Sequence, residues 1–188
     1  MFEALNNFEI PILDAIQSVR CGFLDAVLPI ITAFADHGIG WIIVAVLLII
    51  FPKTRKTGFM SGVALLIGLV IVNMTMKPLF ARIRPYEVNE AMKALLLVEP
   101  LADFSFPSGH TLASFEVATV LMIRDKRMGI PALILAVVIA FSRLYLYVHY
   151  PTDVIVGVVL GILFGVLGVL IVDKAHKAIE KKLSAKKN

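Results

Sequence analysis

Residues 152–172 read TDVIVGVVLGILFGVLGVLIV, a stretch in which every position after Asp153 is apolar or glycine. A helix needs about 20 predominantly apolar residues to cross the hydrocarbon core of a bilayer. The stretch also lacks the regular alternation of apolar and polar faces that a helix on a soluble core would have. It therefore predicts a membrane-spanning helix.

The composition of the whole chain agrees with this prediction. The 188 residues are 59% hydrophobic and 17% charged, with a mean hydropathy of +0.90, which is more apolar side chain than a soluble domain of this length buries. The other apolar stretches are residues 20–35, 38–51, 58–76, 109–123 and 130–147. We expect an all-α, polytopic membrane protein with six transmembrane helices in a single domain, residues 1–188.

The two ends of the chain are predicted to lie outside these spans. Residues 1–17 mix apolar and acidic side chains around Pro11, a pattern typical of a segment that lies at the membrane interface. Residues 173–188 are rich in lysine and are expected to form a basic cytoplasmic tail. The one cysteine, Cys21, excludes a disulfide within the chain.

The distribution of Lys and Arg predicts the orientation, because cytoplasmic loops carry an excess of these residues. Most of the 18 Lys and Arg residues fall on one predicted side, in loops 52–56 and 124–127, in the tail and beside the N-terminus. The exceptions are Lys77, Arg82, Arg84, Lys93 and Arg143. We therefore expect cytoplasmic termini and an outer face that carries the exceptions. The long outer segment 86–106 is the expected place for substrate selection.

Three polar segments interrupt the apolar stretches at this outer face. They are residues 77–85 (KPLFARIRP), 107–110 (PSGH) and 142–153 (SRLYLYVHYPTD). Polar and charged side chains so close to hydrocarbon cost solvation energy and usually mark a functional site. Together the segments contain Lys, Arg, Ser, His and Asp side chains that can bind a phosphate oxyanion and attack it.

In the segment 142–153, Pro151 suits the first turn of a helix, so Asp153 would lie in that turn and reach back to His149. A carboxylate that accepts from one histidine nitrogen fixes the tautomer and leaves the other nitrogen free to attack. The alternative is that Asp153 only caps the helix. Arg143 lies mid-membrane by hydropathy and needs an anionic partner, which a bound phosphate would supply.

In PSGH, Ser108 is a natural N-cap for the helix that follows. The amides of Gly109 and His110 would then be free at the helix N-terminus, where they can bind an anion. The alternative is a plain serine cap followed by an interfacial histidine.

In KPLFARIRP, Lys77 and Arg84 can point at one anion, Arg84 through two parallel hydrogen bonds and Lys77 as a point charge. Arg82 is interpreted differently, as a side chain that snorkels toward the lipid headgroups.

The three segments together resemble the type 2 phosphatidic acid phosphatase superfamily, whose pattern is K-x6-RP, PSGH and SR-x5-H-x3-D. The positions that meet this pattern are Lys77, Arg84 and Pro85, then residues 107–110, then Ser142, Arg143, His149 and Asp153. The superfamily also includes soluble vanadium-dependent haloperoxidases, but the apolar stretches favour its membrane branch. Size and layout are similar to small bacterial members that act on undecaprenyl pyrophosphate or phosphatidylglycerol phosphate.

This resemblance implies hydrolysis of a lipid phosphate or pyrophosphate at the outer membrane face, without a metal ion or other cofactor, through a phosphohistidine. His149 would be the nucleophile, activated by Asp153, and His110 would be the general acid that protonates the leaving oxygen. The residues implied to bind the phosphoryl oxygens are Lys77, Arg84, Ser108, Gly109 and Arg143. The expected partners are an amphiphilic lipid phosphate and membrane lipids, and no nucleic acid.

Two other functions stay open at this point. A lipid phosphotransferase would use the same phosphohistidine but pass the phosphate to a lipid acceptor, so that no free phosphate appears. A transporter would line a path with Asp25, Asp36 and Arg143, but the polar residues gather at one face and no inverted repeat is visible.

Overall fold

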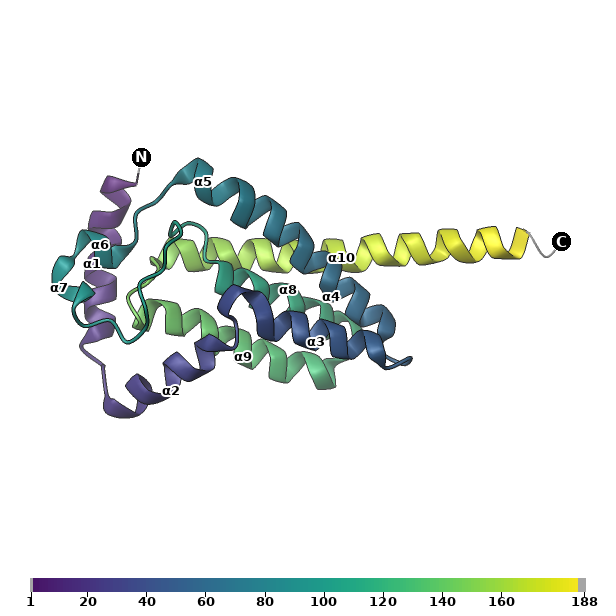
Figure 1. Ribbon diagram of the computed structural model, residues 1–188, viewed down its shortest axis with the longest axis horizontal. Coiled ribbons are helices and arrows are strands. Elements are labelled where there is room, and N and C mark those ends of the chain that lie inside the picture. Colours follow the sequence, from purple (N-terminus) through teal and green to yellow (C-terminus); the bar gives the residue numbers. More distant parts are fainter. Residues whose placement is uncertain (1, 186–188) are drawn as a thin grey trace.

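The chain folds into helices (Figure 1). The computed structural model describes residues 2–185, and no strand occurs among them. The elements are α1 (Glu3–Gln17), α2 (Gly22–Ala33), the 3₁₀ turn η1 (Asp36–Gly38), α3 (Ile39–Ile50), α4 (Arg55–Gly68), the π-helical η2 (Leu69–Met76), α5 (Lys77–Phe80), α6 (Pro85–Val88), α7 (Glu90–Lys93), α8 (Gly109–Arg124), α9 (Lys126–Tyr145) and α10 (Pro151–Ala185). The predicted all-α class is confirmed, and the ends of the predicted terminal segments, residues 1 and 186–188, lie outside the described range.

Four helical runs in the described range are long and apolar enough to cross a membrane, as expected of a multi-pass membrane protein. They are Gly22–Ile50, Arg55–Val88, Lys126–Tyr145 and Pro151–Ala185. The predicted count of six spans is not confirmed. Helices α2 and α3 have 12 residues each, so each is only about 18 Å long. They form one run with a bend where His37 and Gly38 have positive φ angles of 52° and 72°.

The first helix and the end of the last helix lie at opposite ends of the molecule (Figure 1). Helix α1 contacts α9, and its Glu9 carboxylate accepts a hydrogen bond of 2.6 Å from the Thr152 amide at the start of α10. The sequence predicts both termini on the cytoplasmic side. In the structure, α2 and α3 form one helical run between the two ends of the bundle. Which end faces the cytoplasm stays a prediction.

Helix α8 occupies the centre of the bundle, where it contacts α3, α4, α9 and α10. Its approach to α10 depends on glycines spaced four residues apart on α10. A Cβ added at Gly161 would lie 2.7 Å from the Phe115 Cβ and 2.8 Å from the Leu112 carbonyl oxygen. Small residues at this spacing allow membrane helices to pack backbone to backbone. The same contact places the N-termini of α8 and α10 next to each other.

We expect Gly161→Ala to destabilise the protein, because the methyl group has no room between α8 and α10. Overpacking of this kind costs about 1–3 kcal/mol, so the melting temperature in detergent should fall by several degrees. Gly62→Ala on α4 is the matched control, since no atom lies within 4 Å of a Cβ added there. Equal melting temperatures for the two variants would contradict the close α8–α10 contact.

Candidate active site

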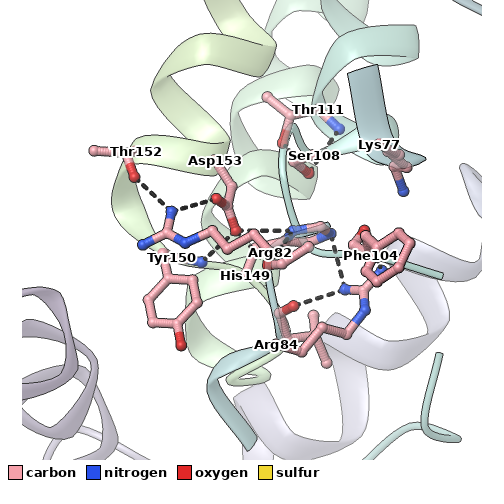
Figure 2. A network of polar contacts seen from close by, with 12 residues as sticks. Lys77, Arg82, Arg84, Phe104, Ser108, Thr111, His149, Tyr150, Thr152 and Asp153 are labelled. Carbon is pink, nitrogen blue, oxygen red and sulfur yellow. Dashed lines mark hydrogen bonds and ion pairs between the residues drawn. The ribbon is translucent and has the colours of Figure 1, made fainter. Parts of the chain in front are cut away.

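Backbone turns bring the three polar segments together at one end of the bundle (Figure 2). Ala81 has a positive φ of 45° and ends α5, and Tyr147 has a φ of 60° in the loop after α9. The first turn leads into the extended segment before α6, and the second lies between α9 and α10, which run in opposite directions. The Ser108 amide donates to the Asp153 carbonyl at 3.1 Å, which ties the second segment to the third.

The loop histidine and the first turn of α10 form the predicted pair. The Asp153 carboxylate lies 3.4 Å from the His149 Nδ1 and accepts a 2.9 Å hydrogen bond from the Tyr150 amide. Ser105 donates to the same carboxylate oxygen and lies 3.4 Å from His149 Nδ1. Asp153 therefore contacts the imidazole as well as the amide at the start of α10.

The other nitrogen of His149 faces the cations. Arg84 Nη1 lies 3.3 Å from His149 Nε2, and a guanidinium can only donate. Nε2 therefore accepts this hydrogen bond, and the proton of the neutral ring sits on Nδ1, toward Asp153. Burial, together with the positive charges of Arg84 and Arg143, lowers the pKa of His149 well below its usual value. The imidazole is thus neutral at physiological pH, with its lone pair on the cation side.

Lys77 and Arg84 point at one anion, as the sequence predicts. In the structure that anion is a carboxylate of the protein itself. Asp103 forms an ion pair with Lys77 and a second ion pair of 2.5 Å with Arg84 Nη2. Although partial burial favours its neutral form, these two cations hold the pKa of Asp103 well below its usual range. Asp103 carries no motif in the sequence, and only its position before PSGH could have suggested it.

The PSGH segment begins α8 as predicted. The Ser108 hydroxyl accepts from the Thr111 hydroxyl at 3.0 Å and caps the helix. Gly109 faces Lys77, because an added Cβ would lie 3.8 Å from its ammonium nitrogen. The His110 Nε2 lies 2.6 Å from an Asp36 carboxylate oxygen in the η1 turn. No sequence pattern pairs His110 with Asp36, which are 74 positions apart.

Two arginines have protein partners that the sequence did not indicate. Arg143 is buried, and its Nη1 donates to the Thr32 hydroxyl at 2.6 Å, so its partner in the structure is a hydroxyl group. Arg82 is only 1% exposed and forms an ion pair of 2.5 Å with Asp153. The interpretation of Arg82 as a snorkelling side chain is wrong, because the turn at Ala81 directs it into the protein.

Comparison with known proteins identifies the family. Residues 58–177 match the model of the PAP2 superfamily. This chain belongs to the PAP2 superfamily. An undecaprenyl-diphosphatase of Sulfolobus acidocaldarius is 38% identical over 77% of this chain and 70% of the relative. A decaprenylphosphoryl-5-phosphoribose phosphatase of Mycobacterium tuberculosis is 34% identical over 89% of this chain and 92% of the relative.

Solved structures agree with the family. The crystal structure of a PAP2-type phosphatidylglycerolphosphate phosphatase from Bacillus subtilis superimposes with a TM-score of 0.71 and 25% identity, covering 94% of this chain and 88% of that one. The named relatives are phosphatases, and this PAP2 chain is a phosphatase as well.

A cavity of about 330 Å³ opens beside the PAP2 site. Arg84 and Asp103 line it, together with Tyr86, Leu101 and Phe104 of the outer segment 86–106. The Tyr86 hydroxyl donates to the Leu101 carbonyl and accepts from the Leu101 amide, each at 3.0 Å, which holds the two ends of this segment together. The segment expected to select the substrate therefore forms the wall of the cavity that reaches the cations.

An anion that binds Lys77 and Arg84 must displace Asp103, so Asp103→Asn should bind anions more tightly. We expect the Kd for inorganic phosphate to fall by roughly tenfold, equivalent to about 1.4 kcal/mol, when measured by calorimetry in detergent. Glu99→Gln is the control, because Glu99 is exposed in the same segment and the substitution changes net charge equally. Equal phosphate affinity in both variants would contradict competition by Asp103.

Proposed function

We propose that this chain hydrolyses a lipid phosphate or pyrophosphate at the outer membrane face through a phosphohistidine on His149, without a metal ion. One observation carries the proposal. His149 Nε2 lies 3.3 Å from Arg84 Nη1, while Nδ1 faces Asp153 at 3.4 Å. A lone pair held toward a cation site and a carboxylate behind the ring are what a histidine nucleophile needs.

The first step is attack of His149 Nε2 on the phosphorus atom. A new N–P bond forms while the bond to the leaving oxygen breaks, and the imidazole becomes positively charged. Asp153 stabilises that charge from Nδ1. The phosphoryl oxygens are bound by Lys77, Arg84 and Arg143, together with the Ser108 hydroxyl and the Gly109 amide. These groups offset the negative charge that a metal ion offsets in other phosphoryl transfers.

In this scheme His110 carries a proton on each ring nitrogen. Nε2 donates to Asp36, and Nδ1 gives its proton to the leaving oxygen and later accepts one from the water that cleaves the N–P bond. Its place at the N-terminus of α8, next to the Gly109 that faces Lys77, supports this role. Asp36 accepts from His110 Nε2 at 2.6 Å. That contact orients the ring, as a carboxylate does for a catalytic histidine.

The substrate is proposed to be undecaprenyl pyrophosphate or phosphatidylglycerol phosphate. Relatives whose names refer to undecaprenyl diphosphate, decaprenylphosphoryl phosphoribose and phosphatidylglycerol phosphate share a phosphate attached to a lipid. Such a lipid would keep its chain in the bilayer while its phosphate enters the cavity beside Arg84 and Asp103.

The orientation supports an extracytoplasmic site. The basic loops 52–56 and 124–127 and the basic tail lie at the end of the bundle away from the site (Figure 1), and such loops are usually cytoplasmic. With the site outside, α1 is outside as well, while residues 173–188 form a cytoplasmic tail of the single domain.

Phosphate release from purified protein in detergent tests the function. We expect activity in EDTA on at least one lipid among undecaprenyl pyrophosphate, phosphatidylglycerol phosphate and phosphatidic acid. His149→Ala should abolish both release and the acid-labile phosphoenzyme. His176→Ala, an exposed histidine on α10, should behave as the unaltered protein. Transfer of the phosphate to a lipid with no free phosphate would show a phosphotransferase, and activity that needs Mg²⁺ would overturn the metal-free scheme.

Cysteine labelling tests the orientation. In a Cys21→Ala background, Glu90→Cys on α7 should react with a membrane-impermeant maleimide in intact cells. Lys177→Cys, exposed near the other end, should react only after permeabilisation. The reverse pattern would place the site in the cytoplasm and the substrate in the inner leaflet.

A further inference from the structure

The N-terminal helix, which the sequence presents as an interfacial segment, contributes a buried carboxylate behind the catalytic pair. Glu9 is 2% exposed in the middle of α1. Its Oε1 accepts from the Thr152 amide at 2.6 Å, and its Oε2 accepts from the Thr152 hydroxyl at 3.1 Å. A carboxylate at this position satisfies a free amide of the α10 N-terminus and is favoured by the helix dipole.

Arg82 connects Glu9 to Asp153. Arg82 Nη2 forms an ion pair of 2.5 Å with Glu9, and Nη1 forms one of 2.5 Å with Asp153 (Figure 2 shows the second). The guanidinium lies 3.8 Å from the centre of the Tyr150 ring and 4.7 Å from that of Phe2. Two carboxylates and two aromatic rings therefore hold this side chain in one position.

The charges of this chain of contacts balance those of a positive His149 imidazole only when Glu9 is present. A buried charge costs several kcal/mol unless a partner offsets it. Arg82 faces Asp153 on one side and Glu9 on the other, so the three side chains together carry one negative charge. That is the charge needed to stabilise a positive imidazole on His149. Without Glu9, the full charge of Arg82 would act on Asp153 and weaken its hold on the histidine.

Resting on the proposed function, we infer that Glu9 and Arg82 are positioning residues for the reaction. They hold the Asp153 carboxylate at His149 and leave it the negative charge that the phosphohistidine step requires. Among the contacts of the described residues, neither side chain contacts Lys77, Arg84 or Arg143, the cations proposed to bind the phosphate. Helix α1 is thereby a working part of the active site, and more than an anchor at the membrane surface.

Steady-state kinetics of Glu9→Gln test this inference, on whichever lipid of the panel the unaltered protein hydrolyses fastest. We expect kcat to fall roughly 10- to 100-fold, because a small misplacement of reacting groups lowers the rate by such a factor. KM should stay within about threefold of the value for the unaltered protein. Glu3→Gln is the matched control, because Glu3 is exposed on the same helix and the substitution is identical. It should match the unaltered protein.

The pH profile separates positioning from a merely structural role. The acid limb of kcat/KM reports protonation of the free nucleophile. Glu9→Gln removes a negative charge, so the limb should move to lower pH, whereas Arg82→Gln removes a positive charge and should move it to higher pH. Arg82→Lys keeps the positive charge, but the lysine ammonium cannot reach both carboxylates. This variant should therefore lower kcat with little shift of the acid limb. The other groups that face His149 are the same in every variant: Asp153, Arg84, Arg143, Lys77 and His110.

The outcomes separate the inference from the proposed function. If the unaltered protein releases phosphate and folded Glu9→Gln matches Glu3→Gln in kcat, KM and pH profile, the inference is overturned and the function stands. If the unaltered protein hydrolyses no lipid of the panel, both are overturned. Should Glu9→Gln fail to fold, Asn6→Ala replaces it, since Asn6 accepts from Arg82 Nε at 3.1 Å and carries no charge. A kcat of Asn6→Ala several-fold below that of the unaltered protein supports the inference, and an unchanged kcat overturns it.

Discussion

The buried carboxylate of Asp153 is the group on which the rest of this site depends. A charge removed from water is tolerated only where donors surround it, and here Arg82, Ser105 and the Tyr150 amide all donate to it. These donors come from the segment after α5, the segment before α8 and the loop before α10. Satisfying one side chain therefore fixes the relative placement of three parts of the chain that are far apart in sequence.

The cations on the other side of His149 pose the opposite problem. Lys77 and Arg84 lie close enough to share one carboxylate, and like charges at that distance repel each other. In the structure Asp103 offsets this repulsion, with its side chain half exposed beside the cavity. The Asp103 carboxylate thus lies between these two cations with a charge of the same sign as that of a phosphate group, on the side of His149 away from Asp153.

Sequence reasoning succeeded where the chemistry is local. His149 and Asp153 are four residues apart across a helix start, so their contact follows from a proline and a helix N-terminus. It failed for Arg82, because hydropathy places an arginine near the bilayer surface but cannot show that the turn before it points inward. Asp103 belongs to no motif, and its partners are set by tertiary packing. The predicted count of six spans is not confirmed, and Gly38, which bends a single helical run, resembles in sequence a loop between two short helices.

The contact between Glu9 and Thr152 also constrains how the protein is made. The two residues are 143 positions apart, so the first helix leaves the ribosome long before its partner exists. At roughly 5–20 residues per second, translation needs on the order of ten seconds to span that interval. Arg82 follows Glu9 by only 73 positions, but the start of α10 is missing until the end of the interval. The contacts behind His149 are therefore complete only after the start of the final helix has been made.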